Sequence, residues 1–252
     1  MLIALLTDIH ANREAFDACR AEALRLGAEK FVYLGDLVGY GADPSYIVDR
    51  VAEDFSRGAV SLIGNHDLAA VEGPASYMHA IAREAIEWTA RQLDPRQIAF
   101  LAAMPFSAST FNDAGVKTLY VHADASAPEQ FIYITGTEVA ERSLNATGAH
   151  ITFCGHVHRP QLYHMAPGKP PFPFVPTANF PTPLARSQKW LAVLGSVGQP
   201  RDGNPLAAFT LYDDARGSLT LLRVPYDIDK TAQKILAAGL PDFLAERLYE
   251  GR

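Results

Sequence analysis

The chain has 252 residues, a net charge of −6 at pH 7 and a sequence pI near 5.7. Because 48% of its residues are hydrophobic and 20% are charged, it can bury a core, which excludes an intrinsically disordered chain. The acidic balance argues against a nucleic-acid polymer as partner, but a small anionic substrate could still be drawn in by bound cations. Two cysteines, Cys19 and Cys154, are too few for a disulfide framework and are predicted to be buried thiols.

The N-terminus lacks the features of a signal peptide, since its apolar run breaks at Thr7 and Asp8 and has no basic start. No apolar stretch approaches the roughly 20 residues that a membrane-spanning helix needs. We therefore expect a soluble cytoplasmic protein without a membrane partner. The oligomeric state stays open.

The first part of the chain alternates predicted strands and helices. A buried strand over residues 2–6 precedes a helix over 13–26, and a strand over 30–34 precedes a helix that begins at Pro44 after Asp43 as N-cap. This order predicts a mostly parallel sheet, with functional side chains beyond the carboxyl ends of its strands. The predicted buried faces of the two helices are Phe16, Cys19, Ala23 and Leu26 in the first and Ile47, Val48, Val51 and Phe55 in the second.

Residues 74–104 interrupt the alternation with two helical patterns. Because they follow a cluster of polar residues, we interpret them as a small helical cap beside a functional site; two ordinary packing helices explain them equally well. The apolar residues of the patterns are Tyr77, Ile81, Ala85 and Trp88 in the first and Ile98 and Leu101 in the second.

Residues 165–187 contain seven prolines, a density that predicts no regular structure but a long surface loop or an edge extension. Such a loop could serve as a lid or a subunit contact, or it could be inert. The remaining chain predicts strands over 190–194, 206–212 and 218–224, the last two joined by a hairpin turn. A helix capped by Asp229 and a final helix from Pro241 follow. Without an internal repeat or compositional break, residues 1–252 are predicted to form one domain.

Five predicted strands end in side chains that can bind metals; they cover residues 2–6, 30–34, 60–63, 118–121 and 151–154. Since carboxyl ends of parallel strands meet at one edge of a sheet, these side chains are expected to form one site. Their oxygen and imidazole donors suit two cations, for which Mn, Fe, Zn and Ni are all compatible. The stretches are Asp8-Ile9-His10, Gly35-Asp36, Gly64-Asn65-His66-Asp67, the lone His122, and Gly155-His156-Val157-His158.

The spacing within these stretches suggests how the donors are used. In extended chain, Asp8 and His10 point to the same side, as do His156 and His158. Asp36 stands alone after its strand and could offer one carboxylate oxygen to each of two metals about 3.5–4 Å apart.

The five stretches, in this order, resemble the calcineurin-like metallophosphoesterase superfamily. The resemblance extends through Gly195–Gly203, which is similar to the small bacterial branch that includes diadenosine polyphosphate hydrolases and phosphodiesterases. It implies a four-layer α/β/β/α sandwich. It also implies a phosphoesterase with two divalent or trivalent metals, Mn or Fe by preference, which attacks a small phosphodiester or nucleotide anhydride with a metal-bridging hydroxide.

The same resemblance implies roles for individual residues. His66 would be a catalytic histidine that binds no metal, and Asp67 would orient the loop or a ligand. Asp36 would be both bridging ligand and catalytic residue. The implied ligands are Asp8, His10, Asp36 and His158 for one metal and Asp36, Asn65, His122 and His156 for the other.

The chain departs from the family pattern at two places. Gly39-Tyr40-Gly41 stands where phosphoprotein phosphatases of this superfamily carry Asp-Arg-Gly, which disfavours that activity. Ala123 and Val193-Leu194 also differ from the residues usual in relatives. A non-catalytic, metal-binding scaffold is the remaining alternative, although such scaffolds tend to lose the residue that corresponds to His66.

Polar and aromatic side chains near the motifs are candidate substrate contacts. Each could equally be an ordinary surface or structural residue. They are Asn12, Arg13, Tyr40, His79, Arg159 and Arg201.

Overall fold

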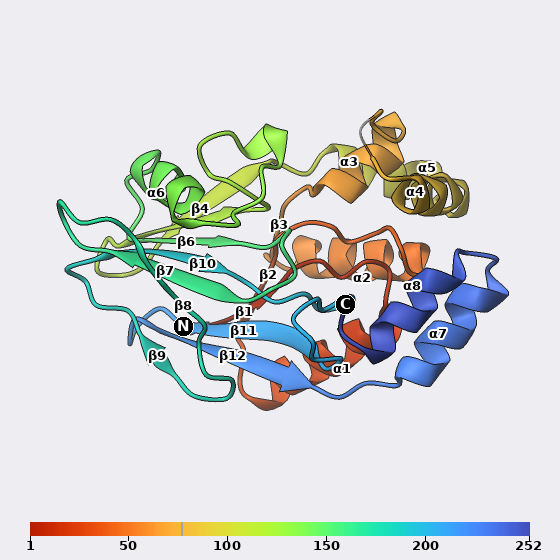
Figure 1. Cartoon of the computed structure of the whole chain (residues 1–252). Helices are drawn as coiled ribbons and strands as arrows, with labels where there is room; N and C mark the ends of the chain where they lie inside the picture. The colour runs from red at the N-terminus through yellow and green to blue at the C-terminus, as the bar shows by residue number, and fades with distance from the viewer. Residues whose placement is uncertain (77) are drawn as a thin grey trace.

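The strands form two six-stranded sheets in the computed structural model, which describes residues 1–76 and 78–252 (Figure 1). Sheet A has the order β3-β2-β1-β11-β12-β9 and consists of β1 (Leu2–Leu6), β2 (Lys30–Tyr33), β3 (Val60–Ser61), β9 (Thr182–Pro183), β11 (Ala207–Asp213) and β12 (Ser218–Val224). Sheet B has the order β4-β5-β6-β10-β7-β8 and consists of β4 (Ser107–Phe111), β5 (Lys117–Val121), β6 (Ile151–Cys154), β7 (Gln161–Met165), β8 (Phe172–Phe174) and β10 (Lys189–Val193).

Both sheets are mixed. The predicted parallel order holds for β3-β2-β1 in sheet A and for β5-β6-β10 in sheet B. The other strands pair in antiparallel fashion, so the predicted parallel order describes only one half of sheet A and the centre of sheet B.

Three hydrophobic clusters separate four layers, which confirms the predicted α/β/β/α sandwich. In β1, Leu5 faces sheet B, while Leu6 faces the helices, as the alternation of a strand requires. The cluster between the sheets includes Leu5 and Phe153, and a third cluster joins sheet B to α6 (Thr137–Asn145). The sheets thus bury both faces.

The remaining helices lie outside the sheets or at one end of them (Figure 1). Their apolar stripes close the outer layers, and α1 packs on β11 and β12. They are α1 (Arg13–Arg25), α2 (Pro44–Ser56), α3 (Asn65–Glu72), α4 (Ala80–Gln92), α5 (Pro95–Ala102), α7 (Ile228–Ala237) and α8 (Asp242–Glu246), with 3-10 turns η1 (Pro128–Gln130) and η2 (Arg247–Tyr249). None of the helices in the described ranges is long and apolar enough to cross a membrane.

Two predictions for the helices are wrong in detail, and a third holds only in part. Phe55 is 49% exposed and packs on Phe100 of α5, because it lies at the rim of the buried face of α2. Asp43 is the N-cap residue of α2, as predicted, but its carboxylate accepts a hydrogen bond from Lys234 and makes no capping bond to the helix. The cap of α7 is Asp227, two residues before the predicted Asp229.

Helices α4 and α5 pack against α2 and α3 beside sheet A. Ala85 of α4 belongs to a cluster with α7 and α8, and Trp88 packs against it. Ile81 is exposed, and Tyr77 lies outside the described residues. The capping role of residues 74–104 therefore stays a prediction.

The proline-rich segment 165–187 contains two short strands, contrary to the prediction that it lacks regular structure. β8 forms the edge of sheet B and β9 the edge of sheet A. Pro173 and Pro183 lie in these edge strands, where a missing N–H costs no interior ladder hydrogen bond. The proline-rich segment thus supplies an edge strand to each sheet, which agrees with the predicted edge extension.

Candidate two-metal site

The candidate ligands lie together in the loops after β1, β2, β3, β5 and β6, on both sheets. Asp8, His10 and Asp36 follow strands of sheet A, while His122 and His156 follow strands of sheet B. Each is almost fully buried. One cluster of polar side chains therefore lies where the carboxyl ends of the two sheets meet.

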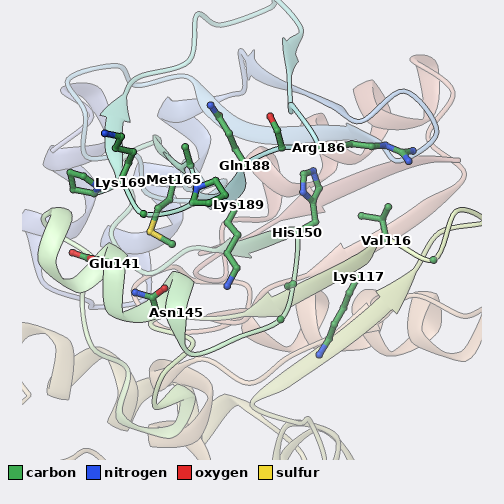
Figure 2. A pocket seen from close by; sticks show the side chains of 18 of the residues that line it. Val116, Lys117, Glu141, Asn145, His150, Met165, Lys169, Arg186, Gln188 and Lys189 are labelled. Carbon is green, nitrogen blue, oxygen red and sulfur yellow. The ribbon is translucent and has the colours of Figure 1, made fainter.

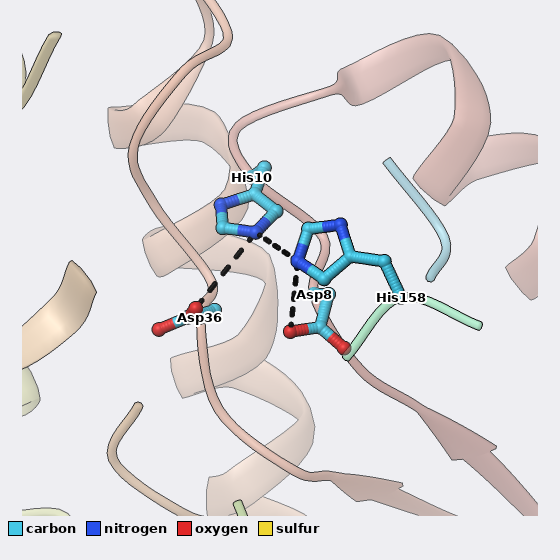
Figure 3. Close-up of side chains that lie close together, drawn as sticks. All are labelled: Asp8, His10, Asp36 and His158. Atoms are coloured by element: carbon cyan, nitrogen blue, oxygen red, sulfur yellow. Dashed lines mark hydrogen bonds and ion pairs between the residues drawn. The ribbon is translucent and has the colours of Figure 1, made fainter. Parts of the chain in front are cut away.

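Asp8, His10, Asp36 and His158 form the first ligand group, with donor atoms within 4.8 Å of one another (Figure 3). Nε2 of His158 lies 3.3 Å from Oδ1 of Asp8 and 3.1 Å from Nε2 of His10. Nε2 of His10 lies 3.8 Å from Oδ2 of Asp36. The side chains enclose a space that a cation of tetrahedral or octahedral preference could occupy.

Asp36, His122 and His156 form the second ligand group. Nε2 of His122 lies 3.3 Å from Oδ2 of Asp36 and 3.3 Å from Oδ1 of Asn65. Nε2 of His156 is buried without a hydrogen-bond partner. The amide oxygen of Asn65 adds a neutral donor to this group.

Asp36 belongs to both groups, but its two carboxylate oxygens are not divided between them, one for each metal, as the sequence predicts. Its Oδ1 accepts a hydrogen bond from the backbone N–H of His66 at 2.8 Å. Its Oδ2 faces both His10 and His122. A single carboxylate oxygen therefore lies between the groups, and the other fixes the start of α3.

The orientation of three histidine rings makes the cluster suitable for binding cations. Nδ1 of His10, His122 and His158 lies 3.1, 2.7 and 2.7 Å from the carbonyl oxygens of Val38, Leu34 and Gln199. A carbonyl only accepts, so each Nδ1 carries the proton and each Nε2 offers a lone pair inward. The Nε2 atoms of His10 and His158 then face each other at 3.1 Å, an unfavourable contact that a cation between them relieves.

Burial and charge shift the pKa values of these groups in ways that suit metal binding. Burial lowers the pKa of His156 to about 3 and keeps its imidazole neutral, as a ligand must be. Against burial, the Asp36 carboxylate raises the pKa of His122 to about 9. A positive charge is therefore favoured beside Asp36, either as a proton on Nε2 of His122 or as a cation that replaces this proton.

The ligands are presented by left-handed turns, not by extended chain as predicted. Asp8 and His10 have φ values of 52° and 49°, and His156 and His158 have 69° and 61°. Non-glycine residues adopt this region at a cost, which short polar side chains such as Asp tolerate best. The turns bring Asp8 and His10 into one group, but they direct His156 and His158 to different groups.

Two glycines allow the ligand loops to touch. A Cβ at Gly64 would lie 2.2 Å from the backbone nitrogen of Asp36, and a Cβ at Gly155 would lie 1.9 Å from Oγ1 of Thr7. Only glycine permits such approach. Gly64 thus holds the Asn65 loop against the Asp36 loop, and Gly155 holds the His156 loop against β1.

His66 lies beside the ligands without belonging to either group. Its ring is 4.9 Å from that of His10, and its Nδ1 is buried without a partner. Burial lowers its pKa to about 4, so the ring is neutral near pH 7. Asp67 accepts hydrogen bonds from the backbone N–H groups of Gly64 and Val38. It thereby orients the loop whose Val38 carbonyl contacts Nδ1 of His10.

Of the predicted substrate contacts, Tyr40 and Arg201 lie close to the ligands. The Tyr40 ring is 4.7 Å from the His10 ring and 4.4 Å from the His66 ring. Cζ of Arg201 lies 5.8 Å from the centre of the Tyr40 ring. Arg159 is exposed and donates to the carbonyl of Arg201, which supports that loop.

The structure gives the other three candidates different surroundings. Asn12 is buried, caps α1 and donates to the carbonyl of Gly198. Arg13 pairs with Asp17 and lies over the ring of Tyr46. His79 is exposed at the start of α4. Asn12 therefore has a structural role, and Arg13 is engaged on the surface of α1.

Sequence reasoning missed two side chains near the ligands. Tyr133 stacks on His156 with ring centres 3.9 Å apart and stays 49% exposed. Burial raises the pKa of Tyr40, and the charges of Arg201 and, less strongly, of Arg247 from η2 oppose this shift. Neither lies in a motif, so only tertiary packing reveals them.

A large cavity of about 1160 Å³ lies elsewhere (Figure 2). It is lined by the starts of β5 and β10, at Lys117 and Lys189, and therefore lies at the opposite end of sheet B from the ligands. Figure 2 shows the basic side chains of Lys117 and Arg186 pointing in different directions. The cavity does not gather them into one site.

The fold and the donor set together define an α/β metallohydrolase. The family model of the calcineurin-like phosphoesterase superfamily domain matches residues 1–214, and the chain belongs to that superfamily. Members depend on two metals, and the chain is a metal-dependent phosphoesterase.

Individual proteins resemble the chain over its whole length. It is 31% identical to the uncharacterized protein MJ0912 of Methanocaldococcus jannaschii, over 100% of this chain and 98% of that one. A metallophosphoesterase from Sphaerobacter thermophilus has a TM-score of 0.86 and 29% identity, covering 100% and 99% of the two chains. The hypothetical protein PH1004 from Pyrococcus horikoshii has the same fold, with a TM-score of 0.76 and 16% identity over 100% and 98%.

Proposed function

We propose that this phosphoesterase hydrolyses a small phosphodiester or a nucleotide phosphoanhydride, such as a diadenosine polyphosphate. The observation that carries the proposal is the pair of ligand groups that share Asp36, with imidazole lone pairs directed inward. The similarity of Gly195–Gly203 to the small bacterial branch supports the choice of substrate class. We further propose Mn or Fe as the metals, with Zn and Ni also compatible.

The residues around the cations have separable roles in this proposal. Bound at the two groups, the metals would neutralise phosphoryl oxygens and lower the pKa of a bound water. Asp36 holds the groups together. His66 has an unpaired ring nitrogen and donates a hydrogen bond or, once a bound phosphate anion has raised its pKa, a proton to the leaving oxygen. The ring of Tyr40 packs on the rings of His10 and His66 and shields one side of them from solvent.

The alternatives are less well supported. A non-catalytic scaffold has no need for a buried histidine without a partner, yet His66 is one. A phosphoprotein phosphatase of this superfamily carries arginine at the position of Tyr40. Here the position holds a phenol ring packed against two histidines, which leaves no guanidinium there for a phosphate.

The test is a substrate screen of metal-reconstituted protein. Nucleotide polyphosphates, cyclic nucleotides, bis(p-nitrophenyl) phosphate and a phosphopeptide would be compared at equal concentration, with Asp36→Asn as the inactive control. We expect turnover of diesters or anhydrides well above that of the phosphopeptide. A protein that binds two metals and cleaves none of these would support the scaffold instead.

A further inference from the structure

The loop between η1 and α6 places two aromatic side chains against the second ligand group. The ring of Phe131 lies 5.8 Å from that of His122 and 6.4 Å from that of His156. The ring of Tyr133 stacks on that of His156, with centres 3.9 Å apart and planes at 21°. The loop therefore covers the imidazoles of this group with aromatic surface.

The two aromatic residues differ in their exposure. Phe131 is only 8% exposed and also packs near Phe106, so the core accounts for it. Tyr133 is 49% exposed, although His156 covers one face of its ring. The exposed area of the tyrosine ring therefore lies on its outer face and its edge. An apolar ring face is thus open to solvent directly above a ligand histidine.

The backbone on both sides of Tyr133 is held by buried side chains. Phe131 precedes it by two residues, and Ile134, which is 3% exposed, belongs to the cluster that joins sheet B to α6. Between these two anchors and the ring of His156, the tyrosine ring is held before any ligand arrives. Binding to a preorganised ring costs little ordering entropy, so its outer face can contribute to affinity.

The partner that fits such a face is another planar ring. Aromatic rings and nucleobases stack on a tyrosine face, and every base has a π-face to offer. The tyrosine ring lies one stacking distance from an imidazole of the ligand group. A nucleotide whose phosphate is bound at the ligand groups therefore carries its base, joined through the sugar, within reach of Tyr133.

We propose that the outer face of Tyr133 binds the nucleobase of the substrate and so determines its class. The preferred substrate is then a nucleotide derivative, not a sugar phosphate or an inorganic polyphosphate. This proposal rests on the proposed function, because it refines the substrate of the same site.

The first test measures binding without turnover. Adenosine 5′-monophosphate and ribose 5-phosphate, which differ by the base, would be titrated by calorimetry into manganese-loaded protein. We expect Tyr133→Ala to weaken the nucleotide roughly 5–100-fold, the range for one lost base–aromatic stack, and to change ribose 5-phosphate less than about threefold. Tyr133→Phe keeps the ring and should bind the nucleotide as the wild type does.

Phe111→Ala is the matched control for the loss of an exposed aromatic ring. Phe111 is 66% exposed and pairs with Lys117, at the end of sheet B opposite to the ligands, so its removal should change neither affinity. Metal content and melting temperature are measured for every variant. Equal weakening of both ligands by Tyr133→Ala, or loss of metal, would show that Tyr133 only supports His156 and would overturn the stacking site. Equal affinity of the wild type for the two ligands would overturn it as well.

The second test compares turnover of diadenosine tetraphosphate with that of inorganic tripolyphosphate, a phosphoanhydride without a base. Tyr133→Ala should reduce the preference for the nucleotide, measured as the ratio of the two kcat/KM values, through a higher KM for the nucleotide. Tyr133→Phe should retain this preference. An unchanged ratio in Tyr133→Ala would overturn the stacking site alone. A wild-type protein that cleaves neither these substrates nor an aryl diester would overturn the proposed function, and calorimetry would still decide whether Tyr133 binds a base.

Discussion

Asp36 is the residue on which both ligand groups depend, since its Oδ2 faces His10 and His122. Asp36→Asn replaces the shared negative charge by a neutral amide. We expect it to reduce metal content as well as turnover, and to cost more than Asn65→Ala, which removes a donor from one group only. Elemental analysis alongside kinetics checks this. A variant that keeps two metals and a near-normal rate would contradict the shared role of Asp36.

His66→Ala should separate catalysis from metal binding. Because His66 lies in neither ligand group, both metals should remain. Turnover should fall by roughly 10²–10⁴, the range for a lost general acid. The loss should be largest for alkoxide leaving groups and small for nitrophenolate, which leaves without a proton. Equal losses would show that His66 stabilises the phosphoryl oxygens, and no loss would remove it from the mechanism.

At the scale of elements, the start of α3 is closely constrained by the loop that carries Asp36. Gly64→Ala places a methyl group 2.2 Å from the backbone of Asp36, so the two loops must separate. We expect a destabilisation of about 1–3 kcal/mol and weaker metal binding. Gly148→Ala is a matched control, since a Cβ there meets nothing within 4 Å. Chemical denaturation and metal titration measure both, and indistinguishable effects of the two changes would refute the close-contact argument.

The sequence predicted the elements that carry strong apolar or capping patterns. β1, β2, β5 and β6 were predicted because their residues are buried on both faces. β4 was missed because its residues are only half-buried or exposed. The 2-residue β3 is shorter than the predicted strand over 60–63, and the start of α3 was not predicted, since the ligand residues themselves form the first turn of the helix.

The surroundings of the site were less accessible to sequence reasoning. Motif spacing gathered the seven candidate ligands, yet it carried no information on which oxygen of Asp36 lies between the groups. Tyr133 approaches the ligands only through packing of distant segments, and it has no local signature. Arg13 is close to the ligands in sequence, but the direction of α1 turns it toward Asp17.

At the scale of the whole molecule, the candidate ligands connect sheet A with sheet B. Metals bound there should stabilise the folded chain by about 2.7 kcal/mol at 100-fold excess over Kd, a rise of roughly 5–10 °C in Tm for a chain of this size. Phosphodiester hydrolysis should need the same metal, with manganese a good activator. Differential scanning fluorimetry and rate assays on stripped and reloaded protein test both. Full activity after complete metal removal would rule out this dependence.

The origin of the ligands in two sheets also has a kinetic consequence. Asp8 and His158 lie at opposite ends of the N-terminal two-thirds of the chain, and they meet only when the sheets have docked. Neither sheet alone can assemble a complete ligand group. During refolding, metal binding should therefore begin later than the formation of β-structure, because it requires the two sheets to dock. The rate of manganese uptake in stopped-flow experiments should then measure the rate of this last step of folding.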